Sequence, residues 1–117
     1  MRVLLDENLP YDLIAALAGR SVSTVSGLGW AGTKNGALLK RASGVTDAFV
    51  TMDGKLEHQQ DISVLPVGVV VVGAPSNRMP DLIPLVSEML AALDRVRPGK
   101  VEHVGRAGRR RNDLKRT

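Results

Sequence analysis

The run VGVVVVG at residues 67–73 consists of valine and glycine alone. A strand with one face in water alternates between apolar and polar residues, whereas a strand covered on both faces does not. Valine also favours extended backbone because its side chain is β-branched. We therefore predict a strand over residues 67–73, at the centre of the core, in a sheet that has helices on both faces.

The rest of the chain alternates between expected strands and expected helices. Further strands are expected over residues 2–5, 21–25, 48–51 and 100–104, the last of them at an edge of the sheet. Helices are expected over residues 10–18, 37–42 and 55–60, and from Pro84 to Val96. This alternation predicts a parallel sheet with right-handed crossovers. The expected fold class is therefore α/β, a three-layer α/β/α sandwich with a mainly parallel central sheet of four to five strands.

Length and composition narrow the class of protein. A chain of 117 residues fits one domain with its own core. It contains no cysteine, which excludes disulfides, thiolate metal sites and cysteine nucleophiles. Asp6 and Glu7 interrupt the first apolar run, so we expect no secretory leader, and the apolar stretch at residues 64–74 is too short for a membrane helix. We expect a cytoplasmic protein with no membrane partner.

Basic residues are concentrated at the C-terminus. The segment GRAGRRRNDLKRT, residues 105–117, is rich in arginine and poor in apolar residues. We therefore expect a folded domain over residues 1–104, followed by a basic, disordered tail. The tail has two interpretations: an arm that holds the phosphates of a nucleic acid, or a terminus that only increases solubility.

Two of the expected strands end in acidic residues. MRVLLDE leads to Asp6 and Glu7, and DAFVTMD leads to Asp53. Because ligands of parallel sheets bind at the carboxyl ends of the strands, these acids are expected to share a pocket there. Neighbouring carboxylates repel each other unless a cation or proton lies between them, so they form a candidate cation site. Asp47 precedes its strand, and is expected at the opposite edge in a structural role.

The segments VLLDENLP, GLGWAGTKNGALLKRA and DAFVTMDGKLEHQQD, in this order, resemble the compact PIN-like domain family related to the VapC toxins of toxin–antitoxin systems. The resemblance covers roughly residues 1–93, and its specific parts are the DEN and T-x-D segments. It implies a PIN-like fold and a metal-dependent endoribonuclease, a hydrolase that uses Mg²⁺ or Mn²⁺ to cut RNA. It also implies a cognate antitoxin protein as partner, and leaves a homodimer open.

The resemblance assigns roles to individual residues. Asp6 and Asp53 match the metal-binding acids, and Thr51 accompanies Asp53 in the T-x-D segment. Asn35 stands where the family has an acid; its amide oxygen can ligate a hard cation or position a water, but brings no charge. With Glu7 as a residue that orients the site, the expected catalytic residues are Asp6, Asp53, Asn35 and Glu7. The residues expected to bind substrate are Thr51, Lys34, Trp30, Arg109, Arg110 and Arg111.

The sequence patterns around four other residues give less specific predictions. Trp30, the only tryptophan, either stacks on a base or packs its loop against the sheet. Glu57 can turn towards the acids if residues 55–60 are helical. His58 and His103 lack the spacing of metal ligands and are expected to be solvated.

Two other classes of function are open. The first is a catalytically degenerate PIN-like module that binds RNA or an antitoxin without cutting. The second is a receiver-like phospho-acceptor domain in which Asp53 accepts the phosphoryl group. A receiver domain needs a lysine at the end of its fifth strand, whereas Lys100 stands at the start of that strand.

Overall fold

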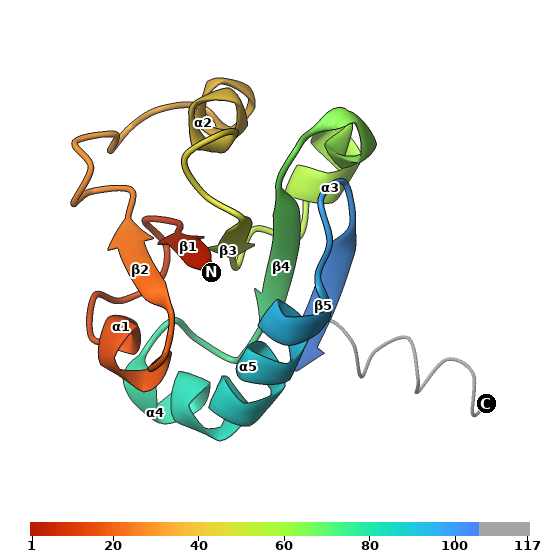
Figure 1. Cartoon of the computed structure of the whole chain (residues 1–117). Coiled ribbons are helices and arrows are strands. Elements are labelled where there is room, and N and C mark those ends of the chain that lie inside the picture. The colour runs from red at the N-terminus through yellow and green to blue at the C-terminus, as the bar shows by residue number, and fades with distance from the viewer. Residues whose placement is uncertain (106–117) are drawn as a thin grey trace.

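The computed structural model describes residues 1–105, which form a five-stranded, all-parallel sheet between two layers of helices (Figure 1). The strand order is β2-β1-β3-β4-β5. The predicted α/β fold class is therefore confirmed, with every strand pair parallel. The strands are β1 (Arg2–Leu5), β2 (Ser21–Thr24), β3 (Ala48–Thr51), β4 (Gly68–Gly73) and β5 (Val101–Gly105).

The helices are short, and several differ from the expected ranges. They are α1 (Leu13–Ala16), α2 (Asn35–Ala42), α3 (Leu56–Gln59), α4 (Met79–Leu82) and α5 (Val86–Arg95), with single 3₁₀ turns at η1 (Ile62–Val64) and η2 (Ile83–Leu85).

The helix expected over residues 10–18 is reduced to α1. At both of its ends the chain forms tighter bonds to the third preceding residue, from Leu13 N–H to the Pro10 carbonyl and from Leu17 N–H to the Ile14 carbonyl. The helix expected from Pro84 to Val96 is confirmed as α5, which begins two residues later, at Val86. Pro84 lies in the 3₁₀ turn η2 directly before it, and α4 precedes that turn.

Strand β4, which lies between β3 and the edge strand β5, is buried on both faces, as its unalternated valines predict. Val70 and Val72 belong to a core formed with α1, α4 and α5, which includes Leu13 and Met89. The intervening Val69 and Val71 belong to a second core on the other face, under α2 and α3. Figure 1 shows these two groups of helices on opposite sides of the sheet.

No helix within residues 1–105 is long and apolar enough to cross a bilayer. The basic tail expected over residues 105–117 lies, apart from Gly105, outside the described residues. The same holds for Arg109, Arg110 and Arg111.

Candidate active site

Asp6 and Thr51 are brought together by the pairing of β1 with β3. Leu5 lies opposite Val50 in this pair, so the residues that follow meet at the carboxyl edge of the sheet. Thr51 is fully buried and Asp6 is 7% exposed. The Thr51 hydroxyl donates a 2.7 Å hydrogen bond to Oδ2 of Asp6. The Asp6 N–H continues the sheet by donating to the Val50 carbonyl over 2.9 Å.

Asp53 joins the same cluster through both its backbone and its side chain. Its N–H donates to Oγ1 of Thr51 over 3.0 Å. Its carboxylate accepts a 3.1 Å bond from Nδ2 of Asn35 and a 3.0 Å bond from the N–H of Lys55. Asn35 is the first residue of α2, so the start of that helix reaches the acids. Four residues assigned from the sequence, Asp6, Asn35, Thr51 and Asp53, therefore form one hydrogen-bonded cluster.

The burial of Asp6 shapes the electrostatics of this cluster. Burial raises the pKa of Asp6, and the negative charges of Glu7 and Asp53 raise it further. Hydrogen bonds from the Thr51 hydroxyl and the Glu7 N–H act in the opposite direction. The charged form of Asp6 is therefore disfavoured, and a cation beside it would relieve that cost.

Two asparagines that the sequence analysis did not assign complete the cluster. Nδ2 of Asn8 lies 3.4 Å from Oδ2 of Asp6 and 3.3 Å from Oγ1 of Thr51. The Asn8 carbonyl in turn accepts a 3.1 Å bond from Nδ2 of Asn77, which lies in the loop after β4. Asn8 belongs to the DEN segment after β1, and Asn77 follows the end of β4. Both could have been predicted as site residues if amide side chains, as well as acids, had been considered at the ends of the strands.

The remaining residues assigned from the sequence lie around this cluster. Glu7 is exposed, and its Oε2 accepts a 3.3 Å bond from the N–H of Gly32, which ties the glycine-rich loop to the carboxyl edge. Lys34 is exposed and immediately precedes α2, without a capping hydrogen bond from its side chain. Trp30 is partly buried and packs against the core under α2, with the guanidinium carbon of Arg41 at 5.9 Å from its ring centroid. Trp30 thus packs over a face of the sheet with part of its side chain exposed, so that both of its interpretations stay open.

Glu57 and His103 differ from expectation. Nε2 of His103 lies 2.6 Å from Oε1 of Glu57, and their side chains are only 14% and 17% exposed. The prediction of a solvated His103 is wrong, because the register of β5 places it beside Val71, on the face covered by α3. Glu57 is held towards β5 by this contact and does not turn towards the acids. His58 is exposed, as expected.

Asp47 lies at the opposite edge of the sheet, as expected. Its Oδ2 accepts a 2.7 Å bond from the N–H of Arg2, and its Oδ1 lies 3.2 Å from Nη2 of the same arginine. Hydrogen bonds from the side chain and backbone of Arg2 lower the pKa of Asp47. Asp47 therefore anchors the start of β1 and is separate from the acidic cluster.

The oxygen atoms at the carboxyl edge suit a hard cation. Mg²⁺ commonly takes one or two protein carboxylates and completes its shell with water and phosphate. Asp6 and Asp53 supply two carboxylates, and Asn8 and Asn35 direct their amide nitrogens towards these carboxylates as hydrogen-bond donors. Residues 1–105 contain no group of three or more His, Cys, Asp or Glu side chains placed to hold a metal. The donor set therefore fits a sparsely ligated ion that takes further ligands from its substrate.

Comparison of the chain with protein-family models, curated proteins and solved structures yields no match. The structure itself establishes a small parallel α/β fold with a five-stranded sheet of order 2-1-3-4-5. The assignment of a function therefore rests on the chemistry of the residues at the carboxyl edge.

Proposed function

We propose that this chain is a PIN-like, Mg²⁺- or Mn²⁺-dependent endoribonuclease, the toxin component of a toxin–antitoxin pair. The observation that carries the proposal is the hydrogen-bonded cluster of Asp6, Thr51, Asp53 and Asn35. These residues come from three distant segments, which are the segments that resemble the PIN-like family. They converge at the edge where parallel sheets bind their ligands.

Each residue of the cluster has a distinct task in this proposal. Asp6 and Asp53 hold the ion, which when bound would lower the pKa of a water and offset charge on the phosphoryl group. Thr51 fixes the orientation of the Asp6 carboxylate, and Asn35 fixes that of Asp53, by the hydrogen bonds they donate. Preorganised ligands of this kind need no rearrangement when the substrate arrives.

The direction of the strands supports a role for the basic tail. All strands are parallel, so β5 ends at the same edge as β1 and β3. Only β4 lies between β3 and β5, which puts the two strand ends roughly 10 Å apart at the usual strand spacing. The end of β5 at Gly105 therefore lies near the acidic cluster, and the basic segment follows it in the sequence. In this proposal Arg109, Arg110 and Arg111 hold RNA phosphates.

A titration with Mn²⁺ in the presence of an RNA oligonucleotide tests the proposal. Wild type should cut the RNA only when metal is present, and Asp6→Asn and Asp53→Asn should reduce cutting to background. Asp47→Asn is the matched control, because it makes the same substitution at the opposite edge. Metal-independent cutting, or full activity of both Asp6→Asn and Asp53→Asn, would contradict the proposal.

A second candidate is a degenerate PIN-like module that binds RNA or an antitoxin without cutting. It is favoured by the uncharged amide at Asn35 and by the hydrogen bonds that both carboxylates already accept. RNA binding without cutting in any metal would select this candidate. The receiver-like alternative gains no support, because Lys100 immediately precedes β5 and lies at the amino edge. The antitoxin, a homodimer and a cytoplasmic location stay predictions.

A further inference from the structure

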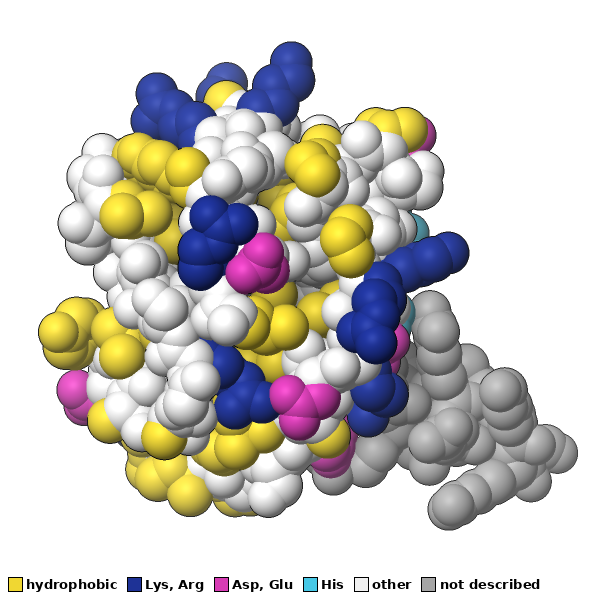
Figure 2. Space-filling model, in the orientation of Figure 1, with side chains coloured by type: hydrophobic (Ala, Val, Ile, Leu, Met, Phe, Trp, Pro, Cys, Tyr) yellow, Lys and Arg dark blue, Asp and Glu magenta, His cyan; other side chains and the backbone are white. Residues whose placement is uncertain are grey.

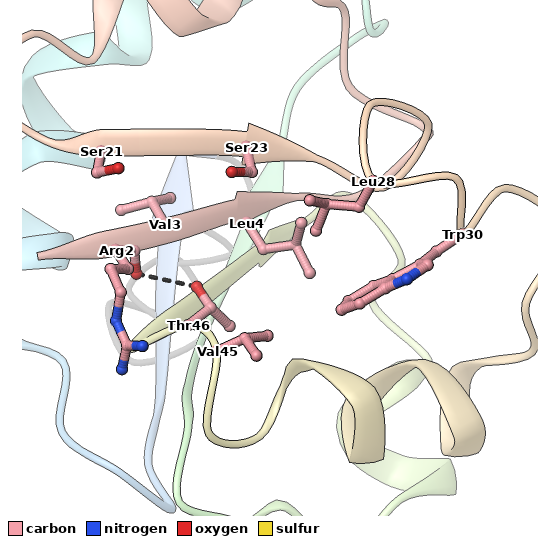
Figure 3. Close-up of a pocket in the computed structure, with 9 residues that line it drawn as sticks. All are labelled: Arg2, Val3, Leu4, Ser21, Ser23, Leu28, Trp30, Val45 and Thr46. Atoms are coloured by element: carbon pink, nitrogen blue, oxygen red, sulfur yellow. Dashed lines mark hydrogen bonds between the residues drawn. The ribbon is translucent and has the colours of Figure 1, made fainter.

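An open groove of about 260 Å³ lies on the face of the sheet formed by β1 and β2 (Figure 3). The edge strand β2 has only exposed and partly buried residues, and those that line the groove are exposed. Leu4 lies in the groove, and Leu28 and Val45, which border it, are 42% and 52% exposed. The groove is smaller than the roughly 300–1,000 Å³ of pockets for drug-sized ligands, so it suits a single flat ring system.

An aromatic ring reaches into one end of the groove. Figure 3 shows Trp30 at the end opposite Arg2, with its ring directed into the space between β1 and Val45. Arg41 lies over this ring, an arrangement that attracts the guanidinium to the π-system. The backbone N–H of Trp30 donates a 2.9 Å bond to the Val25 carbonyl, which fixes the backbone that carries the ring. The ring itself packs against the core under α2 and against Arg41.

Two hydroxyls line the groove along β2. Ser21 and Ser23 are two residues apart on a strand, so their side chains share one face. Both residues are exposed, and Figure 3 shows both side chains on the groove side of β2. A serine hydroxyl both donates and accepts hydrogen bonds. These two positions can therefore pair with donors and acceptors on the edge of a planar ring.

Positive charge lies beside the Trp30 end of the groove, where the guanidinium carbon of Arg41 is 5.9 Å from the ring centroid. The last turn of α2 carries Lys40 and Arg41, both exposed. Figure 2 shows Lys and Arg side chains at the top of the molecule, where Figure 1 places α2, with hydrophobic side chains directly below them. This charge favours a ligand that carries phosphate over an apolar peptide.

We propose that the groove binds one nucleobase of an RNA, stacked on Trp30 and hydrogen-bonded by Ser21 or Ser23. Aromatic side chains commonly hold single-stranded RNA by stacking on its unpaired bases. The loop that carries Trp30 also contacts the acidic edge, since its Gly32 N–H donates to Glu7. A strand bound across the acids can therefore place a flanking base in the groove. This inference rests on the proposed function, which identifies RNA as the ligand. The binding of a base in the groove does not itself require that the protein cut RNA.

The fluorescence of Trp30 provides a direct test, because the chain has one tryptophan. We expect nucleoside monophosphates and short RNA oligonucleotides to quench it saturably in metal-free buffer with the full chain. Ser23→Leu, which fills the groove, should weaken this binding about 10-fold or more. Ser87→Leu is the matched control, because Ser87 is exposed on α5, over the opposite face, and should bind like wild type.

A second set of variants separates stacking from packing. Trp30→Phe keeps an aromatic ring and should bind a labelled RNA oligonucleotide nearly as wild type does, by fluorescence anisotropy. Trp30→Leu keeps apolar bulk but no ring, and should bind about 10-fold more weakly. Equal affinity of these two variants would overturn the stacking site.

Quenching that is absent, or equal in Ser23→Leu and Ser87→Leu, would also overturn the inference. Quenching by an apolar peptide but by no nucleotide would overturn it in favour of a protein partner. The two proposals fail separately. Nucleotide-dependent quenching in a chain that never cuts RNA rejects the nuclease and keeps the base site, whereas RNA cutting without such quenching rejects the base site alone.

Discussion

The hydroxyl of Thr51 donates a 2.7 Å hydrogen bond to the carboxylate of Asp6, which lies 45 residues away in the sequence. Both residues are buried. The same hydroxyl oxygen accepts the N–H of Asp53 over 3.0 Å. One buried hydroxyl therefore connects the two acids and holds the ends of β1 and β3 together.

Removing this hydroxyl should destabilise the fold. Thr51→Val keeps the shape of the side chain but removes the 2.7 Å donor to Oδ2 of Asp6 and the acceptor of the Asp53 N–H, so the free energy of unfolding should fall by about 1–3 kcal/mol. Urea denaturation measures the change. Thr33→Val, in the glycine-rich loop, is the control and should change it by about 0.5 kcal/mol or less. In a double-mutant cycle, the losses of stability caused by Thr51→Val and Asp6→Asn should not add, because the two side chains contact each other. Additive losses would contradict an energetic coupling between Thr51 and Asp6.

Asp6 should lower the stability of the fold at neutral pH. Its folded pKa lies above the ordinary value of 3.8, so between these two values the folded state binds more protons than the unfolded state. Stability therefore decreases as pH rises through this range. Relative to Asp6→Asn, wild type should lose stability from acidic to neutral pH, as measured by urea denaturation at a series of pH values. A stability difference that does not change with pH would refute this assignment.

Asp47 should show the opposite pH dependence. Its pKa is lowered by Arg2, so its contribution is complete above the ordinary value of 3.8 and is lost as pH falls through the folded pKa. The ion pair is about half exposed, so Asp47→Asn should cost at most about 1 kcal/mol at neutral pH. Thermal unfolding at neutral and strongly acidic pH measures the difference. Loss of metal-dependent RNA cutting in this variant would contradict a purely structural role.

Asn35→Asp should increase the affinity for metal and lower the stability of the metal-free protein. Asn35 donates to Asp53 in the present structure, whereas a carboxylate at this position would repel it. We therefore expect a lower melting temperature without metal and a larger increase on addition of Mn²⁺ than in wild type. Asn112→Asp adds the same charge outside the described residues and is the control. An equal Mn²⁺-induced shift in Asn35→Asp and wild type would argue against an ion beside Asn35.

Deletion of residues 106–117 should weaken RNA binding and reduce its dependence on salt, because fewer counterions are released from the RNA. Affinity for an RNA oligonucleotide at several salt concentrations measures the slope. The variant Arg109→Gln, Arg110→Gln, Arg111→Gln keeps the length of the tail and should reproduce most of the change. An unchanged slope in both proteins would reject a role for the tail in holding phosphates.

Local sequence patterns predict those structural features that depend only on residues close together in the chain. The unalternated valines of β4 predict a strand buried on both faces, because burial on one face alone would require alternation. The strand ends at Asp6 and Asp53 likewise predict that both acids lie at one edge, because all the strands run in the same direction. For the same reason Asp47, at the start of its strand, could be assigned to the opposite edge.

The partners of individual side chains depend on loop paths and strand register instead. Glu57 turns to His103 because β5 pairs with β4 in a register that places His103 under α3, and no pattern around either residue specifies that register. Asn77 reaches Asn8 through a loop whose course is set by the packing of α4. The groove beside Trp30 lies over the exposed face of β2, whereas Val22 on the other face packs against the core. Such contacts join residues far apart in the chain, so only the packed fold determines them.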